Sequence, residues 1–288
     1  MALLRGAWVP KKNRVGGRSA AWWPGLAGVA LLAGVAQAQT IASSARQMSA
    51  RSLKWDVYYQ GTQGQDLNFK QTTSGSCTGG GGINPSFACG SSGNVPASID
   101  AGAIILQVTY QPWENLQYYA GLGAGNLTMS VSSVSARNVL TGDRPGFLYH
   151  VGVRSVIIPD TIAGPGVAID GRIGWQRYHF NEIHPFTAGA GQIDQRLDIY
   201  QYQIAVETSH RFVFSDPQWS VEPYGGVKWL RSHAYLKDLQ AGGRTGGIQD
   251  TFTPFVGLVV PMTEHESLTA EASFVNGIQY SAGLQVRF

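Results

Sequence analysis

Apolar and polar residues alternate with a period of two along most of the chain. At the end of the chain, one face carries Tyr280, Ala282, Leu284, Val286 and Phe288, and the other carries Gln279, Ser281, Gly283, Gln285 and Arg287. Residues 267–275 alternate in the same way. Because successive side chains of a strand point to opposite faces, this pattern predicts strands with one apolar and one polar face. Between the two stretches, Asn276-Gly277 predicts a two-residue type I′ turn, in which both positions need positive φ.

The same template predicts ten strands, at 52–60, 98–111, 116–128, 147–158, 166–180, 197–214, 219–232, 251–260, 267–275 and 278–288. The connections between them alternate in length. We expect long loops at 61–97, 129–146, 181–196 and 233–250, and short turns at 112–115, 159–165, 215–218 and 261–266. Pro223 and Pro254 fall inside two strands and predict either bulges or misplaced boundaries, since proline cannot donate a ladder hydrogen bond.

Glycines indicate which face of the sheet is concave. Gly121, Gly123 and Gly125 share one face, and elsewhere glycines share a face with charged residues, as Gly226 does with Glu222. Small residues suit the crowded inner wall of a closed sheet, so we expect the charged face inside and the apolar face outside. A continuous apolar outer face has no place in water, and closure pairs every backbone group, as hydrocarbon requires. The fold predicted is an all-β, transmembrane, antiparallel up-and-down β-barrel of ten strands, with eight or twelve as alternatives.

The first 38 residues read as a secretory signal peptide. They contain five Lys and Arg residues and no acid, then an apolar run from Trp22 to Val35, then Ala36-Gln37-Ala38. A basic start, a short apolar core and a small-x-small end are typical of such leaders, and the run is shorter than the about 20 residues of a membrane-spanning helix. We expect cleavage after Ala38, a short periplasmic segment over 39–51 and a barrel domain over 52–288.

Composition supports this division. Only 14% of the residues are charged, against roughly 25% in an ordinary soluble domain. The formal net charge of +3 depends on the leader, because the remaining chain has 16 Lys and Arg residues against 18 acids. Nucleic-acid binding therefore loses its electrostatic support. The only two cysteines, Cys77 and Cys89, lie in a Gly/Ser-rich stretch of an exported chain, where a disulfide can persist, and we predict a disulfide staple in the first long loop.

At this point the chain resembles a family. The ending Gly283-Leu284-Gln285-Val286-Arg287-Phe288 resembles the C-terminal signal that the barrel assembly machinery reads in bacterial outer-membrane proteins, with Tyr280, Leu284, Val286 and Phe288 as its apolar positions. Residues 222–226 and 253–257 are similar to strands of the small opacity-type and OmpA-like barrels. The resemblance implies the outer membrane of a Gram-negative-type bacterium, with lipid and lipopolysaccharide around the barrel. It also implies the assembly machinery and periplasmic chaperones as transient partners, but no particular extracellular ligand.

A set of charged residues falls on the face that we expect to line the lumen. A ten-strand barrel is only slightly wider than the eight-strand case, whose interior side chains nearly fill. Opposite charges inside it are expected to pair, because buried ions need compensation. We predict a salt-bridged plug with at most a narrow water path. The residues are Arg154, Asp170, Arg172, Glu207, Arg211, Glu222, Lys228, Glu271 and Arg287.

The sequence gives little support for chemistry. A likeness to ten-stranded omptin-like proteases would call for Asp-x-Asp and Asp-x-His pairs, and neither pair occurs. Lipid A deacylase-like barrels would call for a His-x-Ser pair. His179 and His184 flank Glu182 at a predicted rim, a spacing that suits a metal or acid–base work, although such a cluster is more often polar surface. We predict no catalytic residues, no metal, no cofactor and no enzyme.

The function predicted is therefore structural or adhesive, with recognition carried by the extracellular loops, because loops on a rigid scaffold usually carry recognition. The longest loop, 61–97, is the first place to expect a binding surface. The alternative is a narrow channel for small solutes or hydrophobic compounds. The third candidate is a hydrolase at the rim, built on His184 and Glu182.

Overall fold

The computed structural model describes residues 50–70, 94–132, 137–161, 164–185, 191–214, 220–240, 242, 244–274 and 276–288. The predicted signal peptide, nearly all of the predicted periplasmic segment, and Cys77 and Cys89 lie outside these residues. In the part of the chain that is described, no helix is long and apolar enough to cross a membrane.

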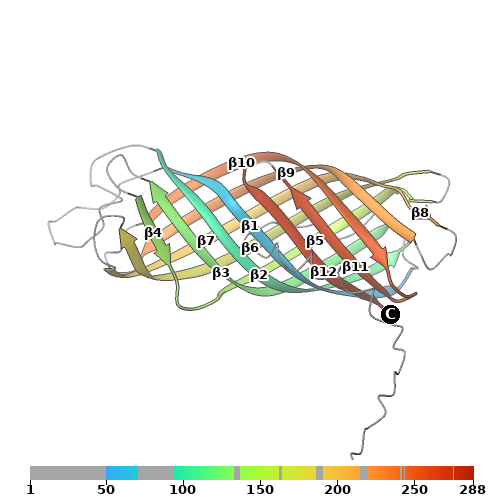
Figure 1. The fold of residues 1–288 in the computed structure, drawn as a ribbon, viewed down its shortest axis with the longest axis horizontal. Coiled ribbons are helices and arrows are strands. Elements are labelled where there is room, and N and C mark those ends of the chain that lie inside the picture. The colour runs from blue at the N-terminus through green and yellow to red at the C-terminus, as the bar shows by residue number, and fades with distance from the viewer. Residues whose placement is uncertain are drawn as a thin grey trace, which may run out of the picture. The chain divides into compact units, whose positions relative to one another are not determined.

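The described chain is all β (Figure 1). Its strands are β1 (Ser52–Lys70), β2 (Asn94–Trp113), β3 (Leu116–Ser132), β4 (Arg137–Thr141), β5 (Gly146–Ile158), β6 (Gly166–Pro185), β7 (Gly191–Ser209), β8 (Phe212–Val213), β9 (Ser220–Asp238), β10 (Arg244–Pro261), β11 (Glu266–Ser273) and β12 (Ile278–Arg287). Every neighbouring pair is antiparallel.

The strands close into a ring of ten positions, in the order β1, β2, β3, β5, β6, β7, β9, β10, β11, β12 and back to β1. β4 shares the position of β5, because both strands pair with β3 on one side and β6 on the other. β8 is a two-residue strand that pairs with the start of β9. The prediction of a ten-strand up-and-down antiparallel barrel is confirmed.

The ring narrows from ten strands to eight along its length. β11 and β12 have 8 and 10 residues, whereas β1, β2, β6, β7 and β9 have 19 or 20. Beyond the tip of this short hairpin, β1 pairs directly with β10, at Phe69 with Gly247 and Lys70 with Gly246. We call the end that holds Ser52 and Arg287 the terminus end and the opposite one the far end. The far part of the wall therefore consists of β1, β2, β3, β4, β6, β7, β9 and β10.

Most strands run further than the sequence pattern predicted, so the connections are shorter. The expected loop 61–97 is reduced to 71–93, and 181–196 is reduced to 186–190. The expected loops 129–146 and 233–250 likewise contain the end of β3, all of β4, the end of β9 and the start of β10. The physical reason is that the two faces exchange character toward the far end. There the inner face is apolar and the outer face polar, so the template of an apolar outer face no longer fits.

The hairpin turn differs from the prediction by one residue. Ser273 pairs with Gln279, so five residues separate the last paired positions, whereas a two-residue turn would pair Ser273 with Tyr280. In the observed register, polar residues of β11 lie opposite polar residues of β12, as Ser273 does opposite Gln279. This follows because directly opposed residues share a face of the sheet. Asn276 and Gly277 do have positive φ, at 59° and 91°. The turn signal was thus correct in its backbone requirement and wrong in its length.

The two prolines lie in regular strand and not at bulges. Pro223 pairs with Leu258 of β10, and the part of β9 that pairs with β7 begins one residue after it, at Tyr224. On that side the Pro223 carbonyl accepts from the His210 amide at 3.1 Å, a bond that does not need the missing N–H of proline. Pro254 pairs with Val227, and the ladder between β10 and β11 begins one residue after it, at Phe255. Each proline therefore has a ladder partner on one side only, the edge position that proline tolerates.

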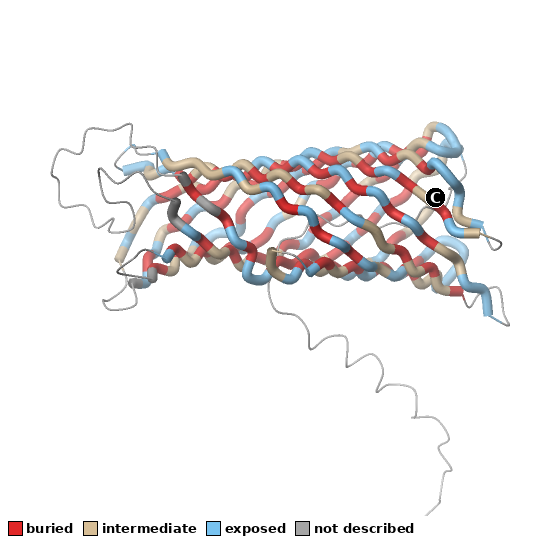
Figure 2. Tube along the Cα trace, turned by 90° about the horizontal axis from the view of Figure 1, so that it is seen from above, coloured by how far each residue is buried: buried red, intermediate tan, exposed pale blue. Residues whose placement is uncertain are grey.

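Burial alternates residue by residue around the wall (Figure 2). In the ten-strand part, the outer face exposes large apolar side chains, such as Ile104, Leu122, Ile204 and Val206, while polar side chains on the inner face are buried. The glycines of β3 lie on the inner face, between buried Gln117 and Leu127. The inner face therefore holds the charged residues, and the outer face is an apolar belt.

Candidate functional site: the barrel interior

The interior has three successive layers from the terminus end to the far end. β6 shows them in order along its inner face: Asp170 and Arg172, then Gln176, then Tyr178 and Phe180. β7 shows the same order from its opposite end, with Glu207 first, then Gln203 and Gln201, then Ile199 and Leu197. The site is thus a charged layer, an amide layer and an apolar layer inside one wall.

The structure places the nine predicted lumen charges in or beside the charged layer. Seven of them are buried: Arg154, Asp170, Arg172, Glu207, Glu222, Lys228 and Glu271. Arg287 is half-buried at the end of β12. Arg211 lies at the terminus end, outside the named strands, where its Nε atom is 3.6 Å from Glu222 Oε1 and it donates to Ser220 Oγ.

Two close ion pairs connect strands across this layer. Arg154 of β5 donates from Nη2 to Glu207 Oε1 of β7 at 2.6 Å, and both side chains are almost fully buried. Lys228 of β9 lies 3.3 Å from Glu271 Oε1 of β11, and the Tyr224 hydroxyl donates to the other oxygen of the same carboxylate at 3.2 Å. Each carboxylate therefore has a cation to compensate its burial.

A hydrogen-bonded chain crosses the layer from β6 to β1. Arg172 Nη2 donates to His150 Nδ1 at 2.6 Å, and His150 Nε2 lies 2.9 Å from Gln107 Oε1. Because a guanidinium only donates, Nδ1 accepts and the imidazole proton lies on Nε2. Gln107 then donates to Asp56 Oδ2, which also lies 3.2 Å from Lys54 Nζ.

Lys54 and Asp56 are charged site residues that the sequence analysis missed. Both are buried on the inner face of β1. Their signal was available, because they share the face of Tyr58 and Gln60 within the predicted strand 52–60. His150 and Gln107 were missed for a different reason, since neither carries a charge that would have marked it.

Glycines on the inner face make room for the large polar side chains. Tyr119 reaches past Gly152 of the neighbouring strand and donates to both oxygens of Asp170, at 2.8 and 3.0 Å. A Cβ added at Gly152 would lie 2.2 Å from the ring of Tyr119, and one at Gly121 would lie 2.3 Å from the ring of His150. The absence of side chains at these two positions is therefore what allows β3, β5 and β6 to share one network.

The amide layer continues the hydrogen bonds toward the far end. Gln176 donates to Gln201 Oε1 at 2.7 Å, and Gln201 donates to Ser232 Oγ at 3.3 Å. The hydroxyl of Tyr178 donates to Gln176 Oε1 at 3.3 Å. The Tyr178 ring belongs to the apolar layer, so this hydrogen bond connects the apolar layer to the amide layer.

The apolar layer fills the eight-strand part of the barrel. Its members come from seven strands, and each is at most 6% exposed. They are Leu67, Phe69, Ala97, Ile99, Ala101, Leu127, Met129, Val131, Leu140, Tyr178, Phe180, Leu197, Ile199, Ala234 and Leu236. Eight strands enclose an interior that is just wide enough for side chains to fill. The narrowing of the ring and this cluster therefore occlude the lumen at the same level.

Two of the three rim candidates lie in contact. His184 Nε2 lies 3.3 Å from Glu182 Oε2, with both side chains about half exposed on the outer face, and His179 is also exposed. Among the described residues, no group of His, Cys, Asp or Glu side chains could hold a metal ion.

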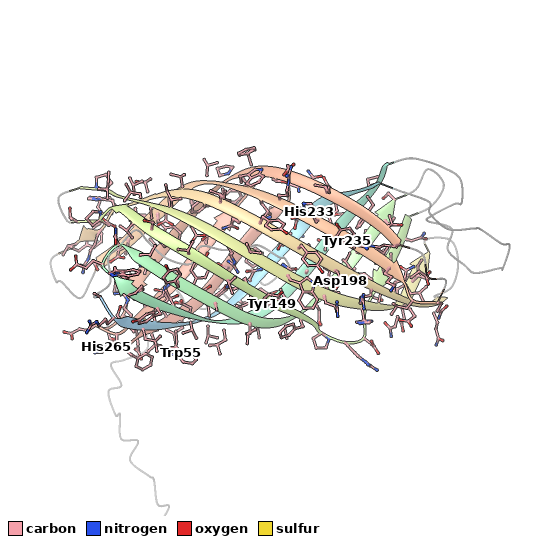
Figure 3. All side chains as sticks on the ribbon, turned by 180° about the vertical axis from the view of Figure 1, so that it is seen from behind. Trp55, Tyr149, Asp198, His233, Tyr235 and His265 are labelled. Carbon is pink, nitrogen blue, oxygen red and sulfur yellow. The ribbon has the colours of Figure 1, made fainter. Side chains whose placement is uncertain are left out.

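The His-x-Ser pair that deacylase-like barrels would call for occurs once in the chain. His265 and Ser267 lie at the β10–β11 connection, at the terminus end. His265 is exposed, while Ser267 is buried on the inner face. Figure 3 shows His265 at that end of the barrel. This motif therefore gives no support to the prediction of no enzyme.

The apolar positions of the C-terminal signal lie on the outer face of β12. Leu284 and Phe288 are exposed, and Tyr280 and Val286 are half-exposed. They thus alternate with the inward-facing Gln279, Ser281 and Gln285.

The fold is that of bacterial outer-membrane β-barrels. The chain is similar to the outer-membrane protease OmpT from Escherichia coli, with 10% identity and a TM-score of 0.50 over 85% of this chain and 100% of that one. It is also similar to the outer-membrane protein OprG from Pseudomonas aeruginosa, with 10% identity and a TM-score of 0.41 over 85% and 99% of the two chains. A third is an outer-membrane channel from Pseudomonas putida F1, with 12% identity and a TM-score of 0.37 over 87% and 100%.

No protein-family model matches the sequence, and no curated protein is found to be similar to it. The similar structures are described as a protease, an outer-membrane protein and a channel. Likeness at these identities extends to the fold and does not choose among these functions.

Proposed function

We propose that the chain is a non-enzymatic outer-membrane barrel of structural or adhesive type, closed to the steady passage of solutes. The observation that supports this most directly is the occlusion of the lumen. The apolar layer closes the eight-strand part, and buried ion pairs occupy the ten-strand part. A solute would have to separate both layers to cross.

The orientation follows from the same proposal. The terminus end faces the periplasm and the far end faces outward. Strands of about 19 residues rise about 3.3 Å per residue, which at a tilt of about 40° gives roughly 45 Å along the barrel axis. An apolar belt is about 25 Å tall. The far part therefore stands beyond the membrane and presents its connections on a rigid support.

Conductance in planar bilayers tests the closed lumen. Purified protein is expected to give no large steady conductance, whereas a porin of known conductance gives open channels under the same conditions. Stable channels of porin size would overturn the proposal and favour the channel alternative. A variant that opens the narrow part gives a second reading: replacing Phe180 and Leu197 with alanine should raise conductance only if the apolar layer is the barrier.

The adhesive part of the proposal concerns the connection between β1 and β2. Scrambling residues 74–93 should leave heat-modifiable folding intact and abolish binding of cells that express the protein to a surface that the native protein binds. Scrambling the predicted periplasmic segment 39–51 is the control. Loss of folding after scrambling 74–93 would make this segment structural and contradict its role in recognition.

A further inference from the structure

The outer wall carries a groove over β3, β5, β6, β7 and β9, with a volume of about 890 Å³. Two rows of directly opposed residues form it. Arg231, Tyr202 and Ile173 lie in one row, and Trp229, Ile204 and Gly171 lie in the other. Because opposed residues run across the strands, the groove crosses the wall at an angle to them. Besides its tyrosines, the polar lining residues are Arg172 and Gln203, which are buried, and Arg231 and His233 of β9.

Gly171 forms the hollow of this groove. It faces outward between Asp170 and Arg172, and its neighbours in the same row are large. A Cβ built at Gly171 would contact only Val153, at 3.9 Å, so the space above its backbone is open. Gly152 and Gly121 differ, because side chains already occupy the space beside them. A glycine that no packing contact requires leaves a depression in an otherwise continuous apolar belt.

The β9 end of the groove carries a cation held in a fixed position. Arg231 makes two hydrogen bonds to Asp250, at 2.8 and 2.7 Å, and its guanidinium lies 5.6 Å from the centre of the Trp229 ring. A guanidinium has five N–H donors, and the pair with Asp250 uses two of them. The remaining donors are oriented without further loss of side-chain freedom, which suits a phosphate. His233, two residues further along the same face of β9, also lines the groove.

More arginines follow on the same side of the barrel. Arg177 lies 4.6 Å from the centre of the Trp175 ring and donates to Asp198 at 2.7 Å, and Arg196 donates to the other oxygen of Asp198 at 3.0 Å. Two guanidiniums thus share one carboxylate and leave a net positive charge. Figure 3 shows Asp198, His233 and Tyr235 on one side of the barrel.

The wall over β1 and β2 has the opposite character. Among the side chains described there beyond the hairpin, the outward-facing charges are Asp66 and Asp100. Arg177, Arg196 and Arg231 thus lie on the side that holds the groove, just beyond the apolar belt, and each is held by an acid of the same side. An apolar depression that ends at a preoriented arginine is complementary to a hydrocarbon chain joined to an anion.

We propose that this groove binds a phosphate-bearing membrane lipid, with one acyl chain along Gly171 and the phosphate at Arg231. The inference rests on the proposed position in the outer membrane. It assigns one lipid a fixed place on the wall, in contrast to the exchanging lipid around the remainder of the belt. Insertion and lipid retention are measured separately, so that either can fail alone.

The test uses the full mature chain in nanodiscs of phosphatidylcholine, with heat-modifiable mobility as the measure of insertion. After release into mild detergent, native mass spectrometry counts retained lipid against added phosphatidic acid or diacylglycerol of equal chain length. The wild type is expected to bind one phosphatidic acid about tenfold more tightly than diacylglycerol, as a charge-assisted contact gives. Gly171→Leu should weaken binding of both lipids by about tenfold, because it fills the space of several methylene groups.

A paired variant tests the headgroup contact without changing net charge. Arg231→Gln with Asp250→Asn should remove the preference for phosphatidic acid and leave diacylglycerol binding unchanged. Ala124→Leu on the outer face of β3, and Arg144→Gln with Asp143→Asn at an exposed ion pair, are the matched controls and should behave as wild type.

Equal retention by the wild type and Gly171→Leu would overturn the groove assignment. Equal binding of the two lipids by the wild type would overturn the phosphate site, and so would the same loss in the controls. Failure of the wild type to insert into nanodiscs would instead contradict the proposed membrane position.

Discussion

Tyr119 reaches Asp170 only because the intervening strand has no side chain at Gly152. A methyl group there would lie 2.2 Å from the tyrosine ring, whose hydroxyl is held by two hydrogen bonds to Asp170. We expect Gly152→Ala to destabilise the barrel by about 1–3 kcal/mol, the usual cost of overpacking. The measurement is the free energy of unfolding by urea in vesicles. Gly171→Ala, on the outer face of the next strand, is the control and should change stability by less than about 0.5 kcal/mol. Equal losses in both variants would contradict this account.

The pair of Arg154 and Glu207 gives a sharper test of the charged layer. Arg154→Met leaves a buried carboxylate without its cation, and we expect a loss of about 3–5 kcal/mol. Adding Glu207→Leu removes the remaining charge and should recover most of that loss, because a packed apolar pair can replace a buried ion pair. The double-mutant cycle measures the coupling between the two side chains. If the double variant is as unstable as the single one, the pair does not act as a unit.

At the scale of the strand, the β11–β12 hairpin determines where the ring narrows. Its tip is bound to the neighbouring strands by the side chain of Asn276, which accepts from the Asp66 amide at 3.0 Å and donates to the Asp66 carbonyl and to Thr251. Asn276→Gly keeps the positive φ and removes these bonds. We expect amide hydrogen exchange at Asp66 to rise at least tenfold, while global stability falls by only about 1 kcal/mol. Unchanged exchange at Asp66 would show that the tip does not hold this seam closed.

The alternating pattern was sufficient to predict the number and order of the strands in the barrel, but not their length. Alternation fixed all ten positions and the inward face of Arg154 and Glu271, because a period of two allows only two orientations. It failed for residues 61–70 and 233–238, where the same alternation continues with the faces exchanged. The same polarity could have corrected the turn, since a two-residue loop would have set Ser273 opposite Tyr280. The local turn motif predicts one register for the hairpin and the polarity of its two strands requires another, and the structure has the second.

The contacts within the lumen lay beyond sequence reasoning for a different reason. Which inward charges meet depends on the stagger between strands far apart in sequence, as with Arg154 and Glu207, 53 residues apart. Nothing in either strand alone specifies that stagger. Uncharged members such as His150 and Gln107 become part of the network only through geometry.

At the scale of the whole barrel, the outer face should tolerate charge at one height and reject it at another. Leu122 and Thr128 both face outward on β3, but Leu122 lies in the apolar belt and Thr128 lies beyond it. We expect Leu122→Arg to cost about 2–4 kcal/mol and Thr128→Arg about 0–1 kcal/mol. Unfolding by urea in vesicles measures both. Similar costs at the two positions would mean that the belt extends to the far end of β3.

The exchange of apolar and polar faces along the strands also marks a height along the barrel axis. On β7 the inner face changes from polar Gln203 to apolar Leu197, while the outer face changes from apolar Ile204 to polar Arg196. On β1 the register shift between Thr62 and Gln65 produces the same exchange, because it turns the apolar positions of the alternation inward at Leu67. The residues at which the faces change character on these strands mark a contour, which is one edge of the apolar belt. If the bilayer were thicker or thinner than this contour allows, every strand would be mismatched at once. The water surface at which this barrel sits is therefore encoded strand by strand, independently of any loop.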